Sequence, residues 1–152
     1  MNWFFDLISN PFLITGVSSW FVAQVLKTII HAVINKKLEL ERLFGDGGMP
    51  SGHSATVTSV AVMAGLVYGT GSFQFALSAI LAIIVCHDAM GVRLETGKQA
   101  VVINEIVKLL TSKQELSEVK LKEFVGHTPF QVGAGILIGA INASLMYYFV
   151  FG

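Results

Sequence analysis

The residues best suited to chemistry lie in a glycine-rich turn from Gly45 to Ala55, GDGGMPSGHSA, directly before a long apolar run. Glycines let backbone amides approach a ligand closely, and Ser51 or Ser54 can cap the helix that follows. A helix N-terminus offers unpaired N–H groups and the positive end of the helix dipole. The turn is therefore a candidate anion site, and His53 adds a proton donor to it.

A second polar feature lies inside the first apolar run, where Gln24, Lys27 and His31 are spaced i, i+3, i+7. This spacing places all three on one face of a helix. Ionisable groups at membrane depth are costly, usually face the bundle interior and are functional candidates. The alternative for Lys27 is that its ammonium group reaches the membrane interface. For His31 a structural role is favoured.

The third apolar run ends in the sequence CHDAMGVR, residues 86–93. Arg93 could clamp phosphate oxygens with its planar guanidinium. Asp88 is expected to form an ion pair with Lys27 or Arg93, and Cys86 and His87 are expected to pack. The sequence has no Cys and His set with metal-ligand spacing, so no metal and no cofactor are expected.

The fourth apolar run is preceded by Gly126-His127-Thr128-Pro129, and His127 and Gln131 are i, i+4 neighbours. Pro129 suits the first turn of a helix. Further along, Gly135, Gly139 and Ala143 form a stripe of small residues that favours close helix packing, either within the chain or in a homodimer.

The composition indicates which elements position these residues. The chain has 152 residues, 53% apolar and only 13% charged, and its mean hydropathy is +0.68. Soluble domains are typically about 25% charged, so a membrane protein is expected. A disulfide scaffold is excluded by the single cysteine, and a nucleic-acid partner is disfavoured by the net charge of zero. Four apolar runs approach the roughly 20 residues of a membrane-spanning helix: 11–34, 53–70, 72–92 and 128–151. We therefore expect one all-α membrane bundle covering residues 1–152.

The charges predict the orientation of this bundle. Nine of the ten Lys and Arg residues lie in the connections 35–52 and 93–126, which emerge on the same side if there are four spans. Positive charge favours the cytoplasm, so the site is expected to face the cytoplasm of a bacterial membrane, with both termini outside. The second connection carries an amphipathic pattern from Lys98 to Leu110. It predicts either a helix lying at the membrane surface or a solvated linker helix.

Taken together, these residues resemble the type-2 phosphatidic acid phosphatase superfamily, which includes lipid phosphate phosphatases and vanadium haloperoxidases. The chain is most similar to a divergent branch of small bacterial and plastid membrane proteins, from Gln24 to Gly139. The superfamily's Pro-Ser-Gly-His motif is intact at 50–53. Lys27 occupies the place of the first motif's lysine, although no Arg-Pro follows. In the third motif Arg93 and His127 are separated by an insertion, and Gln131 replaces the expected aspartate.

The resemblance implies hydrolysis of a lipid phosphate, either a phosphatidyl or prenyl phosphate or a diphosphate, without a metal and through a phosphohistidine. His127 would attack phosphorus, His53 would protonate the departing oxygen, and Gln131 or Glu123 would support His127. The phosphate would be held by Lys27, Arg93 and the turn residues Gly48, Ser51 and Gly52, with Gln24 and Asp88 in support. The expected partners are the lipid substrate and membrane lipids.

Two other interpretations remain open. The missing Arg-Pro and aspartate are compatible with a weakly active or inactive membrane protein that binds or translocates anionic lipid headgroups or small anions. A purely structural bundle would explain the apolar runs, but it would leave the Pro-Ser-Gly-His turn, Lys27 and Arg93 without a role.

Overall fold

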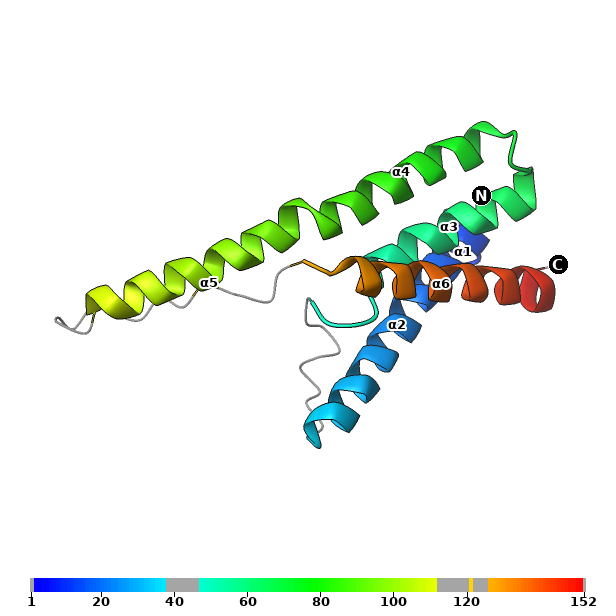
Figure 1. Cartoon of the computed structure of the whole chain (residues 1–152). Helices are drawn as coiled ribbons and strands as arrows, with labels where there is room; N and C mark the ends of the chain where they lie inside the picture. Colours follow the sequence, from blue (N-terminus) through cyan, green and yellow to red (C-terminus); the bar gives the residue numbers. More distant parts are fainter. Residues whose placement is uncertain (1, 38–46, 112–120, 122–125, 152) are drawn as a thin grey trace.

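The computed structural model describes residues 2–37, 47–111, 121 and 126–151, and its regular elements are helices (Figure 1). No strand occurs in these described ranges, which confirms the predicted all-α class. In chain order the elements are α1 (Trp3–Ile8), α2 (Pro11–Asn35), α3 (Gly52–Tyr68), α4 (Phe73–Met90), α5 (Val92–Thr111) and α6 (Pro129–Met146), which continues into a π-helical turn, Tyr147–Phe151.

Local capping residues fix where the long helices begin. The Asn10 side chain accepts a hydrogen bond from the Phe12 amide at 2.9 Å at the start of α2, where Pro11 takes the first helical position. The Ser72 hydroxyl accepts one from the Phe75 amide at 3.1 Å at the start of α4. Between α3 and α4, Gly69 has φ = 81°, a conformation that glycine adopts readily. The short segment between α3 and α4 therefore forms a tight reversal.

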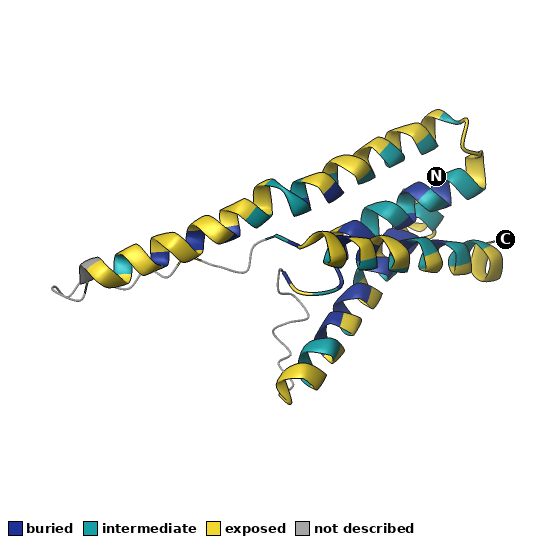
Figure 2. Cartoon of the chain, in the orientation of Figure 1, coloured by how far each residue is buried: buried dark blue, intermediate teal, exposed yellow. Residues whose placement is uncertain are grey.

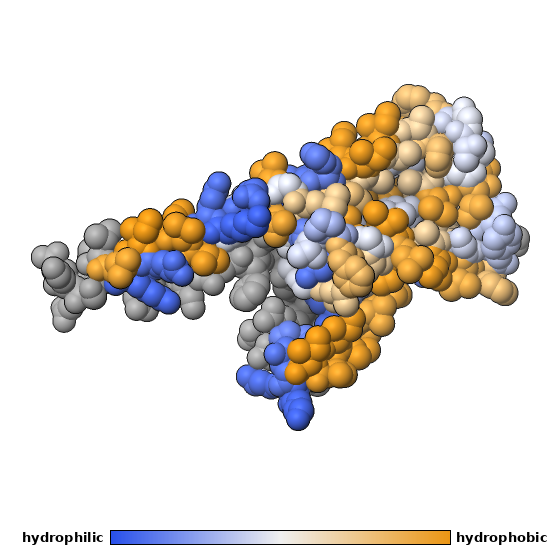
Figure 3. All heavy atoms as spheres, viewed as in Figure 1, coloured by the Kyte–Doolittle hydropathy of each residue, from blue (hydrophilic) through white to orange (hydrophobic). Residues whose placement is uncertain are grey.

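Helix α3 lies at the centre and contacts α2, α4 and α6. Apart from Met63, its buried side is made of small and polar residues, among them Ser54, Ala55, Ser59 and Ala64. The buried side of α2 is similarly polar, and the large apolar side chains of both α2 and α4 point outward (Figures 2 and 3). A small and polar interior with an apolar exterior is typical of helices that pack within a lipid bilayer.

The small-residue stripe of α6 packs against α3. A Cβ atom on Gly135 would overlap the Ser51 carbonyl oxygen, and one on Gly139 would overlap that of Ala55. The two backbones therefore touch, and the stripe forms an internal contact. Further along α6, the Asn142 amide donates to the hydroxyls of Ser18 and Ser19 at 2.9 and 2.8 Å, which ties α6 to α2.

Three helical stretches are long and apolar enough to cross a membrane: Pro11–Asn35, Phe73–Leu109 and Pro129–Phe151. The predicted second span, α3, has 17 residues. At 1.5 Å per residue it is about 25 Å long, slightly shorter than the roughly 30 Å hydrocarbon core. All four predicted apolar runs contain helices at nearly the predicted positions, and a total of four membrane crossings stays a prediction.

Helix α5 covers the predicted amphipathic segment, and it continues the direction of α4 away from the rest of the bundle (Figure 1). Its apolar side chains, such as Val102, Ile106 and Leu109, are exposed, and hydrophilic side chains gather along the same helix (Figure 3). The amide of Asn104 holds Leu121 through two hydrogen bonds, each 2.9 Å long. The location of α5 at the membrane surface remains a prediction.

Candidate active site at the ends of four helices

The glycine-rich turn enters α3 through two residues with positive φ, Gly47 at 77° and Gly48 at 78°. Ser51 is the N-cap of α3, because its hydroxyl oxygen accepts from the Ser54 amide at 3.4 Å and from the Ser54 hydroxyl at 3.0 Å. The Ser51 amide donates to the Gln131 carbonyl at 3.1 Å. This amide, predicted to hold phosphate, is therefore used to attach α3 to α6.

Gly52, which was also predicted to hold phosphate, has α2 as its neighbour. A Cβ atom on it would lie 3.3 Å from Cδ1 of Trp20 and 3.9 Å from Cδ of Gln24. Gly52 thus packs on α2, with Gln24 buried beneath it. The glycines that line the cavity described below are Gly47, from the same turn, and Gly126.

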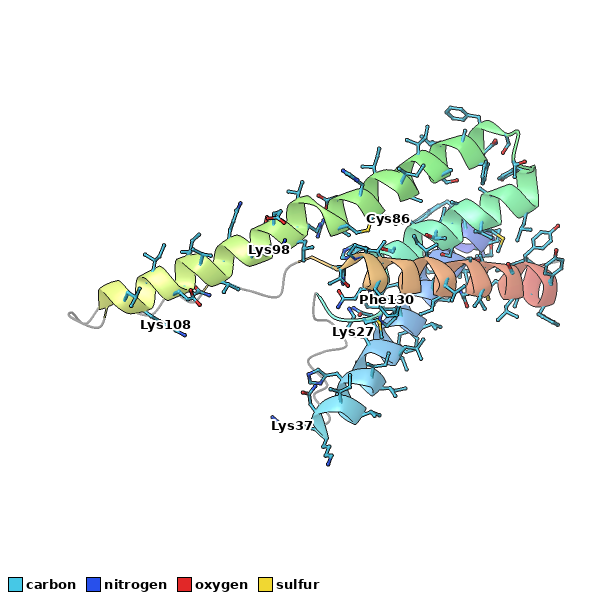
Figure 4. The ribbon with its side chains drawn as sticks, in the orientation of Figure 1. Lys27, Lys37, Cys86, Lys98, Lys108 and Phe130 are labelled. Carbon is cyan, nitrogen blue, oxygen red and sulfur yellow. The ribbon has the colours of Figure 1, made fainter. Side chains whose placement is uncertain are left out.

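Arg93 lies in the first turn of α5, directly after the end of α4. Its Nε donates to the Asp88 carboxylate, which confirms the ion pair that was predicted as one of two possibilities for Asp88. Cys86 lies on the side of α4 that faces the bundle and packs with Ala89 and Val132 (Figure 4), and His87 is exposed. Asp88 therefore holds the Arg93 guanidinium at the end of the bundle that is predicted to face the cytoplasm.

His127 is brought to Arg93 by two backbone contacts. The His127 amide donates to the Ala89 carbonyl at 2.9 Å, near the end of α4. Gly126 has φ = 90°, and a Cβ atom there would overlap the backbone of Arg93 and Leu94. Only glycine fits this close approach with this dihedral angle. The chain that follows the 93–126 connection therefore returns against the junction of α4 and α5.

These contacts place two histidines and an arginine around one cavity of about 50 Å³. It is lined by residues from the turn, α3, α4, α5 and the segment before α6: Gly47, His53, Val85, Ala89, Arg93, Gly126 and His127. A single water needs at least about 10–15 Å³ of such space, so the cavity has room for a small oxyanion. We refer to it as the histidine–arginine cavity.

Lys27 and Gln131 line a second, larger cavity of about 340 Å³, which also includes His31, Gly48 and Phe130. Figure 4 shows Lys27 and Phe130 close together between α2 and α6. Lys27 is buried, with 6% of its surface exposed, and whether its ammonium group reaches the membrane interface stays a prediction. Gly47 lines both cavities, which are therefore neighbours.

His127 lines the histidine–arginine cavity, and its pKa depends in part on Lys27, which lines the neighbouring cavity. Burial lowers the pKa of His127, which is 5% exposed, and the positive charge of Lys27 lowers this pKa further. The Gln131 side chain acts in the opposite direction, His53 lowers the pKa, and the Gly48 backbone raises it. The net shift is downward, so the His127 imidazole is neutral at neutral pH. Among the described residues its buried Nδ1 has no hydrogen-bond partner.

The sequence profile of a family described as the divergent PAP2 family matches residues 8–142. This chain belongs to that family. An uncharacterized membrane protein of Bacillus subtilis (strain 168), YuiD, is 36% identical over 155 residues, covering 95% of this chain and 98% of the relative. No solved structure matches the chain. The three apolar helical stretches and this relative support an integral membrane protein.

In this member of the divergent PAP2 family, Gln131 also has a structural role. Its Oε1 accepts from the Thr128 amide at 3.0 Å, and the Thr128 hydroxyl accepts from the Gln131 amide at 3.4 Å. This reciprocal pair is a capping box, and its Thr-x-x-Gln signature is present in the sequence at 128–131. Glu123, the other predicted supporter of His127, lies outside the described residues.

Proposed function

We propose that this protein is an integral-membrane phosphatase that hydrolyses a lipid phosphate through a phosphohistidine. The observation that carries the proposal is the histidine–arginine cavity, in which His53, Arg93 and His127 meet although they come from distant parts of the sequence. Two imidazoles and a guanidinium around a small cavity suit one phosphoryl group, because an arginine fork matches phosphate oxygens and an imidazole can transfer protons.

The reaction proceeds in two displacements. The neutral imidazole of His127 attacks phosphorus while the bond to the lipid oxygen breaks, and His53 donates a proton to that departing oxygen. Water then attacks the phosphohistidine, with His53 accepting the proton of the water, and inorganic phosphate leaves. Burial and Lys27 favour the neutral, nucleophilic form of His127, as their effect on its pKa indicates.

The chain's own cations stabilise the negative charge of the transferred phosphoryl group. Phosphoryl transfer is catalysed mainly by positioning and by neutralising the charge on the transferred group. Arg93 lines the cavity directly, and Lys27 is near enough to His127 to lower its pKa. In the proposed mechanism these two cations supply the positive charge. No step uses a metal, so a chelator should leave the rate of phosphate release unchanged.

The residue that supports His127 determines the expected rate of hydrolysis. Gln131 cannot stabilise an imidazolium by charge, and in a Ser-His-Asp triad the loss of the carboxylate lowers the rate by about 10⁴. We therefore expect a slow enzyme, unless Glu123 supplies the missing carboxylate.

The test is phosphate release by the protein purified in detergent, with phosphatidate, phosphatidylglycerol phosphate and prenyl phosphates and diphosphates as substrates. The wild type is compared with His127→Ala and His53→Ala. We expect turnover by the wild type alone, with a chelator present or absent. Equal phosphate release by all three proteins would defeat the proposal.

A second candidate is a weakly active or inactive protein that binds or translocates anionic headgroups. It is favoured by the state of two groups: Arg93 is paired with Asp88, and the Gln131 oxygen is engaged in the capping box. Thermal stabilisation by these phosphates, with no turnover of any of them, would favour this candidate over the phosphatase.

We further propose that the protein resides in a bacterial cytoplasmic membrane, with the histidine–arginine cavity facing the cytoplasm and both termini outside. The location of the Lys and Arg residues supports this orientation. Labelling of single cysteines placed at Lys98 and Asn2 by a membrane-impermeant reagent in intact cells tests it. We expect labelling at Asn2 only, and the reverse result would invert the orientation.

The measured mass in detergent would reveal a homodimer.

A further inference from the structure

We propose that the hydrocarbon chain of the substrate lies in an apolar groove between α2 and α3 that begins at His53. This inference rests on the proposed phosphatase function and specifies how its substrate is held. The groove has a volume of about 360 Å³. On α3 it is lined by His53, Thr56 and Val60, which are spaced i, i+3, i+7 and so follow one face of that helix.

His53 is the residue that relates this groove to the chemistry, because it also lines the histidine–arginine cavity with Arg93 and His127. In a lipid phosphate, the oxygen that His53 would protonate joins the phosphoryl group to the hydrocarbon part. A substrate whose phosphoryl group occupies the cavity therefore has its apolar part next to the His53 ring. The apolar groove begins at the same place.

The α2 side gives the groove its shape. Gly16 forms the part nearest Val60, where an added Cβ would lie 3.2 Å from Val60 Cγ2 and would narrow the groove. Trp20 lies at the end near the glycine-rich turn, and Phe12 lies at the other end. The two residues are eight positions apart, which is about 12 Å along a helix. Phe12 stacks on Tyr68 with ring centroids 5.4 Å apart, and this pair bounds the far end.

The groove is open to lipid along its length. Val17 and Leu13 line it and are exposed, with 65% of Val17 accessible. A chain that is already in the bilayer can therefore enter sideways between α2 and α3 while its phosphate stays at the membrane surface. This geometry suits one alkyl, acyl or prenyl chain.

A second apolar groove on the outer face of α6 shows why His53 matters to this assignment. It is of similar size, about 320 Å³, and is lined by Ala140, Ile141, Ser144, Leu145, Tyr148 and Phe149. None of the residues predicted to act on phosphate lines it. It therefore provides a matched control, in which a comparable rim position, Ile141, is 52% exposed.

The first experiment compares kcat/KM for butyl, octyl, dodecyl and hexadecyl phosphate. In the wild type we expect kcat/KM to rise with chain length. Val17→Phe, which partly fills the groove, should lower the hexadecyl value by about tenfold, corresponding to the loss of roughly two methylene contacts, and lower the butyl value much less. Ile141→Phe should resemble the wild type. Leu13→Phe provides a second groove variant if Val17→Phe does not fold.

Two results would overturn the groove assignment: an equal loss of butyl and hexadecyl hydrolysis in both groove variants, or the same chain-length effect in Ile141→Phe. Hydrolysis of butyl phosphate that persists in such a case would leave the proposed function standing, so the two failures can be told apart.

The second experiment measures binding without turnover. The chain has two tryptophans, so Trp3→Phe leaves Trp20, at the groove, as the only reporter. A brominated dodecyl phosphate should quench its fluorescence saturably, and vanadate in the histidine–arginine cavity should reverse the quenching. Equal quenching by the brominated alcohol would overturn the inference. Saturable quenching by a phosphate that is never hydrolysed would support the groove and contradict the proposed hydrolysis.

Discussion

Helix α5 forms the first part of the 93–126 connection and α6 follows its end, yet α6 is packed closely against its neighbours and α5 is not. From Gly126 to Gly139, α6 and its leading segment touch their neighbours backbone to backbone: Gly126 against Leu94, the His127 amide on Ala89, and Gly139 against Ala55. Helix α5 extends away from the bundle with its apolar side chains exposed. The halves of the site are thus joined by backbone contacts at its edge.

The largest effect should follow from restoring a charge at the start of α6. In Gln131→Glu the carboxylate would stabilise the His127 imidazolium formed during the reaction, and a glutamate keeps the capping box. We expect phosphate release to rise by roughly tenfold or more, within the 10⁴ that a triad carboxylate contributes. Gln99→Glu on α5 is the control. A rate that stays at the wild-type value would show that Glu123 or another group already fills this role.

The next largest effect should come from the close contact between α6 and α3. Gly139→Ala introduces a methyl group that overlaps the Ala55 carbonyl, and we expect a loss of about 1–3 kcal/mol in the free energy of unfolding. Gly133→Ala on the same helix meets nothing within 4 Å. It should be neutral or stabilising, by up to about 1 kcal/mol. Denaturant titration in detergent measures both, and equal stability of the two variants would contradict the close packing.

A smaller, pH-dependent effect tests the influence of Lys27 on the site. Lys27 lowers the pKa of His127, so the neutral nucleophile persists to lower pH in the wild type. In Lys27→Met this pKa should rise, and the acid limb of the kcat/KM profile should move to higher pH. Lys98→Met on α5 is the control, because Lys98 is exposed and pairs with Glu95 at 2.7 Å. An unchanged acid limb in Lys27→Met would separate Lys27 from the site.

The smallest effect is expected on α5. Leu109 is 76% exposed, and substitutions at such positions usually change stability by less than about 0.5 kcal/mol. Leu109→Ser should therefore leave unfolding in detergent unchanged. A loss comparable with that of Gly139→Ala would mean that α5 is packed in solution and would remove the contrast between the two regions.

The sequence was sufficient to predict most of the fold. Long apolar runs and Pro129 located the helices to within a few residues, since capping and hydrophobic length are local properties. The meeting of His53 with Arg93 and His127 was predicted because all three residues lie at the ends of apolar runs that face the same side, and the family resemblance implied the same grouping.

Other parts of the site depend on tertiary contacts that residue spacing does not encode. The Ser51 amide was expected at the phosphate, but it is used by the Gln131 carbonyl. Lys27 was expected beside Arg93, but it lines the neighbouring cavity. The direction of α5 could not be predicted either, because an amphipathic pattern indicates which face is apolar but not what covers that face.

The most direct test of the central claim, that His127 receives the phosphoryl group in the histidine–arginine cavity, is mass spectrometry of the protein after rapid quenching during turnover of dodecyl phosphate. The account predicts an acid-labile phosphoryl group on His127, which accumulates in His53→Ala if water attack is slowed more than the first displacement and is absent in His127→Ala. Turnover without any phosphorylated protein, or phosphorylation that persists in His127→Ala, would contradict it.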